Sequence, residues 1–130
     1  MKIPFHKPNV PDSFDQIYTN SIRSGWLTSG SQVQIFEKNL SHLLEAEHII
    51  VVNSCTAALH LALAAQDFKK GDEFIAPTYT FASTVECGIY SSMNPVLVDC
   101  DNSGFLLDLN EVEDNLKKNK KIRVIVPVHF

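Results

Sequence analysis

The 130-residue sequence predicts an α/β fold with a mostly parallel sheet and helices on both faces. Short apolar runs rich in β-branched residues recur along the chain, as expected of buried strands. Between them lie segments of about ten to fifteen residues with helical spacing, which suits the crossovers that join parallel strands. Turn sequences such as Lys70-Gly71-Asp72 and Asn94-Pro95 separate the two kinds of segment.

The first thirty residues are predicted to contain an arm, a helix and a turn-rich segment. Three prolines and two lysines within residues 1–11 prevent a regular element, so this part is expected to be extended. Apolar residues at helical spacing predict a helix over 14–23, which Ser24-Gly25 ends. Residues 26–30 then form a turn-rich segment that carries the only tryptophan. We expect residues 1–30 and 31–130 to be the two parts of the chain.

The second part is predicted to alternate between helix and strand. An apolar stripe supports the first helix, and Asp108 followed by Glu111 resembles a capping box before the last one. We expect helices over 31–45, 56–66, 82–90 and 109–118, and strands over 49–53, 73–76, 96–99 and 122–126. Nothing in the sequence covers the far edge of the last strand, so we expect the N-terminal part of a longer enzyme.

Composition and charge exclude several classes of function. A nucleic-acid footprint needs clustered Lys and Arg, whereas the net charge here is −4. The basic cluster at residues 117–121 fits the solvated end of a helix. Cys55, Cys87 and Cys100 are too few and too far apart for a disulfide framework or a zinc pair. Without a signal peptide or an apolar run of about 18 residues, we expect a cytoplasmic protein with no membrane partner.

The stretch 49–65 carries the strongest functional signal. A buried strand that runs through a small-residue turn into a helix directs the helix's free N–H groups and positive dipole end at one spot, which suits phosphate. The candidate cradle consists of Ser54, Cys55, Thr56 and Ala57. Its expected donors are the N–H groups of Thr56 and Ala57 and the hydroxyls of Ser54 and Thr56. A helix N-cap without any ligand explains the same residues equally well. A thiol nucleophile at Cys55 is disfavoured, since spacing places no histidine near it.

A second group, PTYTFAST at residues 77–84, follows the next predicted strand. An aromatic ring there can lie against a flat heteroaromatic ligand while hydroxyls hold its substituents. Phe81 and Tyr79 are the candidate rings and Ser83 a candidate hydroxyl; packing under the next helix is the alternative for either ring. Phosphate binding next to a stacking ring favours pyridoxal phosphate over a nucleotide. In keeping with this, neither G-x-x-x-x-G-K-[ST] nor G-x-G-x-x-G is present.

Other polar residues at the predicted strand ends have simpler interpretations. Asp99 and Asp101 flank Cys100 at a predicted strand end, and paired acids of this kind are candidate metal ligands. Turn capping is the favoured role for both. His129 follows the last strand on the ligand side of the sheet and is a candidate for lining the site.

Several ordered motifs together resemble one family. SGWLTSGSQVQIFEKNL is similar to that family's glycine-containing start with its FE pair, and VVNSCTAALHLALAA to its S-G-T-A-A-L-x-L-A-L. KKGDEFIAPTYTFAST resembles G-D-E-V-I-x-P-x-x-T-F-x-A-[ST], and NPVLVDCD and VIVPVHF continue the series in order. The family is the DegT/DnrJ/EryC1/StrS group, the sugar-nucleotide branch of the pyridoxal-phosphate aminotransferases. The resemblance covers nearly the whole chain.

The resemblance implies a set of residue roles. Residues 31–130 would be the first part of the large cofactor-binding domain of a fold type I enzyme, which acts as a cytosolic homodimer with shared sites. Thr56 and Ala57 would bind the cofactor phosphate, and Phe81 would stack on the pyridine ring. The substrate side, or the partner's site, would be lined by Trp26, Thr28, Ser29 and Gly30. Cys55 replaces the family's usual glycine, so either the cradle is wider here or its backbone is ordinary.

The resemblance also implies a reaction. The family converts a nucleotide-linked keto-sugar into an amino-sugar for cell-surface polysaccharides or antibiotics, usually with glutamate as the amino donor. A sugar dehydratase of the same fold and a non-catalytic phosphate-binding or regulatory module remain as alternatives. The family's catalytic lysine and the acid that pairs with the pyridinium nitrogen lie beyond residue 130. We therefore expect these 130 residues alone to be inactive.

Overall fold

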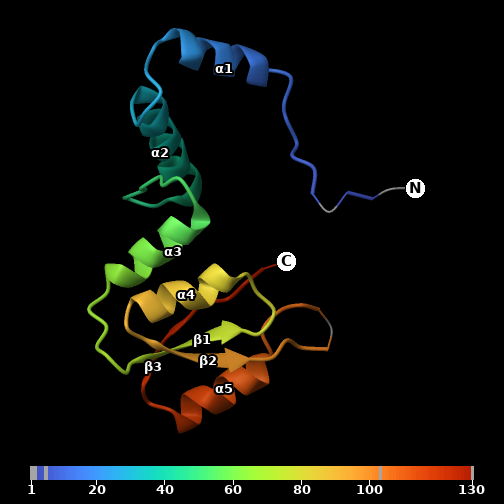
Figure 1. Cartoon of the computed structure of the whole chain (residues 1–130), viewed down its shortest axis with the longest axis vertical. Helices are drawn as coiled ribbons and strands as arrows, with labels where there is room; N and C mark the ends of the chain where they lie inside the picture. The colour runs from blue at the N-terminus through green and yellow to red at the C-terminus, as the bar shows by residue number, and fades with distance from the viewer. Residues whose placement is uncertain (1–2, 5, 103, 130) are drawn as a thin grey trace. The chain divides into compact units, whose positions relative to one another are not determined.

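A computed structural model describes residues 3–4, 6–102 and 104–129 of the chain (Figure 1). The chain divides into two compact units, Met1–Val51 and Val52–Phe130. The division after Val51 follows the contacts between residues. The division after residue 30 was based on expected function, and it remains a prediction.

The first unit contains two helices, as predicted. Helix α1 spans Phe14–Arg23 and α2 spans Ser31–Leu44. Neither helix buries a residue among those that the structure describes. Helix α2 ends at Leu44, and the left-handed backbone of the C-cap residue Glu45 (φ 51°) lets the N–H of Ala46 donate to the carbonyl oxygen of Ser41 at 3.1 Å.

The second unit is a three-layer α/β structure. Its elements in order are α3 (Cys55–Ala64), β1 (Glu73–Pro77), α4 (Ala82–Tyr90), β2 (Asn94–Val98), α5 (Leu109–Lys118) and β3 (Ile122–Ile125). The strand order is β2-β1-β3, and both pairs are parallel. This confirms the predicted parallel sheet. Strand β2 lies at an edge of the sheet. Pro95 lacks an N–H group, and an edge strand tolerates this because one of its sides has no partner strand.

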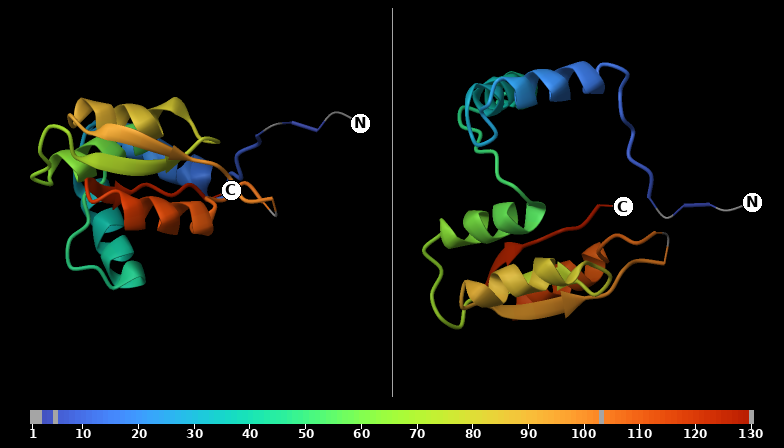
Figure 2. Two further views of the ribbon diagram at one scale, coloured as in Figure 1. Left: turned by 90° about the horizontal axis from the view of Figure 1, so that it is seen from below. Right: turned by 45° about the horizontal axis from the view of Figure 1, so that its top comes forward.

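Helices cover both faces of the sheet, as predicted. Successive residues of β1 point to opposite faces, so Phe74 and Ile75 enter different clusters. Phe74 packs with Leu59 of α3 and Val85 of α4, while Ile75 packs with Val112 of α5. Figures 1 and 2 show α4 and α5 on opposite sides of the strands.

One close approach fixes α4 against the sheet. Phe74 is completely buried, and its ring lies against the backbone of α4 at Gly88. A Cβ added at Gly88 would overlap that ring, so only glycine fits without movement.

The predicted strand over 49–53 is wrong. Within the described residues this segment pairs with no strand, and Ile50 is exposed. The backbone N–H of Val51 instead donates to Oε1 of Glu37 on α2, at 3.0 Å. An apolar β-branched run has strand propensity, but a strand forms only where a neighbouring strand accepts its hydrogen bonds. The sequence of residues 49–53 showed a propensity for strand structure, but it could not show whether a neighbouring strand was available to pair with it.

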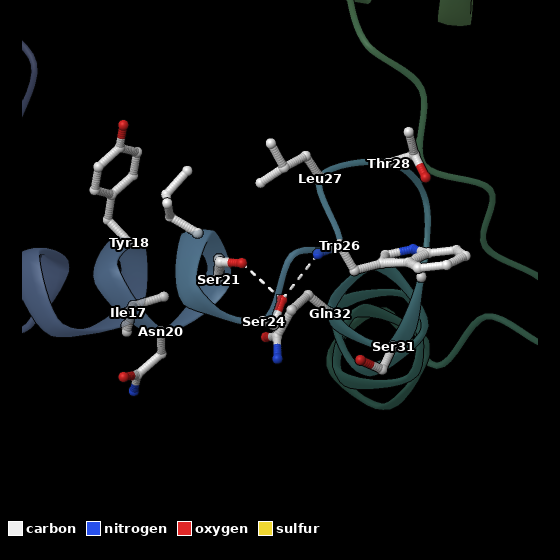
Figure 3. Close-up of a pocket in the computed structure, with 12 residues that line it drawn as sticks. Ile17, Tyr18, Asn20, Ser21, Ser24, Trp26, Leu27, Thr28, Ser31 and Gln32 are labelled. Atoms are coloured by element: carbon white, nitrogen blue, oxygen red, sulfur yellow. Dashed lines mark hydrogen bonds between the residues drawn. The ribbon is translucent and has the colours of Figure 1, made fainter.

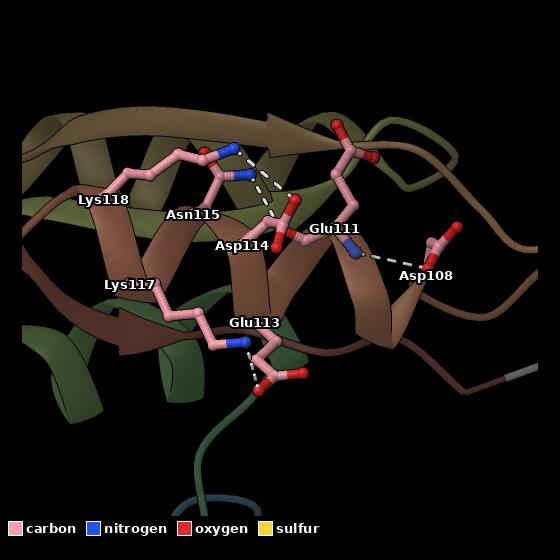
Figure 4. Close-up of polar contacts among 7 residues, drawn as sticks. All are labelled: Asp108, Glu111, Glu113, Asp114, Asn115, Lys117 and Lys118. Carbon is pink, nitrogen blue, oxygen red and sulfur yellow. Dashed lines mark hydrogen bonds and ion pairs between the residues drawn. The ribbon is translucent and has the colours of Figure 1, made fainter.

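Helix α5 begins at a carboxylate cap, as predicted (Figure 4). Oδ1 of Asp108 accepts from the N–H groups of Asn110 (2.8 Å) and Glu111 (3.3 Å). The reciprocal half of the capping box is absent, because the Glu111 carboxylate accepts from the N–H of Asp99 at 2.8 Å. Glu111 therefore ties α5 to the end of β2.

Replacing Asp108 by alanine is expected to lower the free energy of unfolding by about 0.5–2 kcal/mol, because two helix N–H groups lose their acceptor. Urea denaturation monitored by far-UV circular dichroism measures the loss. Asp114→Ala is the control, since Asp114 only meets the exposed Lys118 one turn later and should change stability by less than about 0.5 kcal/mol. Equal stabilities of the two variants would contradict a capping role.

Candidate functional site

The start of α3 and the loop before α4, which contain the predicted cofactor residues 54–57 and 81, lie at the carboxyl edge of the sheet. In Figures 1 and 2, α3 and α4 both begin on the side toward which the arrows of β1 and β2 point. The cradle at the start of α3 and the Thr78–Phe81 loop before α4 are therefore at the same edge. Ligands of open parallel sheets bind at this edge.

The start of α3 combines a helix cap with free donors. Oγ of Ser54 accepts from the N–H of Ala57 at 3.1 Å, so the N-cap interpretation holds. Among the described residues, the N–H groups of Cys55 and Thr56 have no acceptor. The cap thus occupies the Ala57 donor and leaves two adjacent N–H groups, with the exposed Thr56 side chain, at the positive end of a ten-residue helix.

Cys55 does not strain this turn. It is the first residue of α3 and is not among the residues with positive φ. Of the two alternatives at this glycine-like position, the ordinary backbone is the one found. Compared with glycine, Cys55 adds an exposed CH2–SH side chain at this position.

The two candidate rings after β1 have different surroundings. Phe81 is the N-cap residue of α4, and its side chain is 77% exposed. Tyr79 packs against Phe105, with ring centroids 5.0 Å apart and planes tilted by 36°. Phe81 is thus the more exposed of the two rings, since Tyr79 is 52% exposed. Ser83, by contrast, is 7% exposed within α4, and its role in binding remains a prediction.

A hydrogen bond joins α3 to α4 beneath the cradle. Sγ of Cys87 lies 3.5 Å from the carbonyl oxygen of Thr56 and donates to it. Burial raises the pKa of the Cys87 thiol, and the nearby charges of Glu86 and Cys55 raise it further. The thiol therefore stays protonated, and remains a donor, beyond the ordinary range for cysteine. The first turn of α3 is in this way attached to the helix that carries Phe81.

The acids at the end of β2 act as turn caps, as predicted. Oδ1 of Asp99 accepts from the hydroxyl of Thr78 (3.1 Å) and from the N–H of Cys100 (2.8 Å). Oδ1 of Asp101 accepts from the N–H of Gly104 (2.8 Å). In the described ranges no group of three or more acidic, His or Cys side chains is arranged to hold a metal ion.

The first unit has a pocket of about 450 Å³ between α1 and the start of α2 (Figure 3). The indole N–H of Trp26 donates to the carbonyl oxygen of Ser29 at 3.0 Å, and the ring lies directly on Gly30. Trp26 is still 65% exposed. Three of the four predicted substrate residues, Trp26, Thr28 and Gly30, line the pocket, and Ser29 orients the indole.

Sequence reasoning missed three residues that shape these sites. Tyr18 lines the pocket opposite Trp26. The spacing of apolar residues in α1 predicted a helix but did not indicate that Tyr18 lines a pocket. Phe105 and Cys87 act through contacts with residues far away in the sequence, at Tyr79 and Thr56. No local pattern encodes such contacts, so they could not have been found from the sequence alone.

The chain matches known proteins along nearly its whole length. The sequence model of the DegT/DnrJ/EryC1/StrS aminotransferase family matches residues 9–130. The spore coat polysaccharide biosynthesis protein SpsC of Bacillus subtilis is 38% identical over 128 residues, which are 98% of this chain and 32% of SpsC. The chain therefore spans about a third of the length of this relative.

Solved structures agree with the fold. Spr1654 of Streptococcus pneumoniae, assigned as a sugar aminotransferase, was solved in a PMP-form that matches with a TM-score of 0.84 and 30% identity, over 97% of this chain and 31% of that one. Its PLP-form matches with a TM-score of 0.83. The Escherichia coli GDP-4-keto-6-deoxy-D-mannose-3-dehydratase shares the fold at 22% identity, with a TM-score of 0.83 over 97% of this chain and 33% of that one. No helix in the described ranges is long and apolar enough to cross a membrane.

Proposed function

Because the chain belongs to the DegT/DnrJ/EryC1/StrS aminotransferase family, we propose that the whole protein is a pyridoxal-phosphate-dependent sugar aminotransferase. Its proposed substrate is a nucleotide-linked keto-sugar, which receives an amino group with glutamate as donor. We further propose a cytoplasmic homodimer that builds its sites from both subunits. The fold is that of the first part of a fold type I large domain.

The observation that supports this proposal is that unpaired N–H groups at the start of α3 and an exposed aromatic ring at residue 81 lie at the same edge of the sheet. The unpaired N–H groups of Cys55 and Thr56 suit a phosphate, and the exposed ring of Phe81 at the same sheet edge suits a flat heterocycle. These residues fit pyridoxal phosphate, the cofactor in the PLP-form of Spr1654. When bound, pyridoxal phosphate supplies an electron sink for chemistry at the substrate's reacting carbon.

The residues of this chain would bind and orient rather than move protons. The start of α3 neutralises phosphate charge through its two N–H groups, the Thr56 hydroxyl and the helix dipole. Phe81 covers one face of the ring and keeps water from it. The Cys87 bond to Thr56 holds both parts in register. In the first unit, the exposed indole of Trp26 with Thr28, Ser29 and Gly30 is proposed to contact the sugar substrate.

The Thr56 hydroxyl provides a direct test of the cradle. Thr56→Val keeps the shape and the backbone N–H but removes one phosphate donor, so pyridoxal phosphate should bind about two- to tenfold more weakly, or about 0.5–1.5 kcal/mol. Isothermal titration calorimetry of the whole protein measures the change. Thr19→Val on α1 is the matched control and should bind like the wild type. Unchanged affinity in Thr56→Val would remove Thr56 from the site.

The same titration separates the competing functions. Uptake of pyridoxal phosphate, followed by amino transfer from glutamate to a nucleotide-linked keto-sugar, supports the aminotransferase. Cofactor uptake with loss of a sugar hydroxyl instead of transfer would identify a dehydratase. Binding of inorganic phosphate without any uptake of the cofactor would identify a non-catalytic module.

A further inference from the structure

In the loop between β2 and α5, the described residues 99–102 and 104–108 form a hairpin. Cys100 and Leu107 form an antiparallel bridge, and the N–H of Asp101 donates to the carbonyl oxygen of Leu106 at 2.9 Å. At the base, the N–H of Asp108 donates to the carbonyl oxygen of Asp99 at 3.0 Å. Leu107 enters the core cluster of Ile75, Val98 and Val112. The hairpin is therefore anchored to the sheet and holds Phe105 near its tip.

Phe105 brings this hairpin into contact with the loop that carries Phe81. The Phe105 ring packs on Tyr79 at a centroid distance of 5.0 Å, an arrangement in the range for favourable aromatic pairs. The two residues are 26 positions apart in sequence but follow neighbouring strands. Tyr79 lies only two residues before Phe81.

The loop from Thr78 to Phe81 has contacts on both sides of Tyr79. The N–H of Thr78 donates to the carbonyl oxygen of Val98 at 2.9 Å, which fixes the start of the loop. The hydroxyl of Thr80 donates to that of Thr84 at 2.8 Å, which fixes its end to α4. The Tyr79–Phe105 contact fixes the middle of the loop against the hairpin.

We propose that Phe105 is a positioning residue for the cofactor site: by packing on Tyr79, it fixes the loop that places the Phe81 ring beside the start of α3. This inference rests on the proposed function, because it gives the Phe81 ring a ligand to cover. Phe105 itself does not touch the cofactor. Its effect passes through Tyr79, so the two residues should act as one unit.

A double-mutant cycle on the whole protein tests the inference, with pyridoxal phosphate as the titrant. Phe105→Ala and Tyr79→Ala should each weaken binding by about two- to tenfold, the range expected from the loss of one aromatic pair. The double variant should bind pyridoxal phosphate no more weakly than the single variant with the lower affinity, because both changes break the same contact. Phe105→Tyr keeps a ring and should restore wild-type binding.

Leu106→Ala is the control for the hairpin itself. Leu106 is the next residue and is partly exposed, and its backbone hydrogen bond to Asp101 does not depend on its side chain. This variant should bind as the wild type does. Thermal unfolding of all variants accompanies the titration, because a purely structural role would move the melting temperature and leave affinity alone.

The failures of the two proposals are distinguishable. Wild-type affinity in Phe105→Ala, or additive losses in the double variant, would overturn the positioning role while leaving the cofactor site intact. A change in the Michaelis constant for the sugar, with cofactor affinity unchanged, would also overturn it and would assign Phe105 to substrate contact. If the wild type itself takes up no pyridoxal phosphate, the proposed function fails first.

Discussion

Phe81→Ala is expected to weaken pyridoxal-phosphate binding by about 1–3 kcal/mol, which is roughly five- to 150-fold. The ring is 77% exposed in the protein, so its apolar surface is available to be covered by a flat ligand. For the same reason its removal should cost the fold little, within about 0.5 kcal/mol. Calorimetric titration gives the affinity, and urea denaturation gives the free energy of unfolding.

Tyr79 and Leu97 offer comparisons for this variant. Leu97→Ala removes a half-exposed apolar side chain from the edge strand β2 and should leave cofactor binding unchanged. Full affinity in Phe81→Ala would transfer the stacking role to Tyr79. Loss of both affinity and stability would show that Phe81 packs inside the protein, contrary to its exposure here.

Phe74→Ala is expected to have the opposite pattern, with a loss of about 3–5 kcal/mol of unfolding free energy. Phe74 is completely buried in β1, between the helices of one face and the sheet. Removing its ring leaves a cavity that α4 cannot close without moving. The midpoint of urea denaturation should fall steeply, and a domain of this size could unfold altogether at 37 °C.

Phe74→Leu distinguishes cavity formation from other causes. It keeps most of the apolar volume, so it should cost well under half of what alanine costs. Equal losses in the two variants would indicate that the ring has a role beyond filling space. Retention of wild-type stability in Phe74→Ala would contradict the assignment of Phe74 to the core.

Local patterns in the sequence were enough to predict most elements of the second unit. Helical spacing predicted α4, and Asp108 predicted the start of α5. Strand β1 extends through Pro77, one residue beyond the predicted range 73–76. The predicted strand over 49–53 failed because strand formation depends on a neighbour, which the local sequence does not describe. Helix α3 begins at Cys55, one residue before the predicted start at residue 56, because Ser54 is the N-cap.

The candidate site was predictable in its location and less so in its details. Small residues before a helix pattern pointed to residues 54–57, although the strand expected before them is absent, and the end of β1 pointed to residue 81. The division of donors was not predictable, since the capping of Ala57 by Ser54 depends on side-chain geometry. Nor was the Tyr79–Phe105 contact, because it joins two loops that the sheet alone brings together.

The bare backbone at Gly88 has a consequence for chemistry at the other end of its helix. At Gly88 the backbone of α4 rests directly on the Phe74 ring, and an added Cβ would overlap it. A methyl group at this point would require the helix or the ring to move. The absence of a Cβ at Gly88 therefore helps to set the position of the Phe81 ring, which lies seven residues earlier at the start of the same helix.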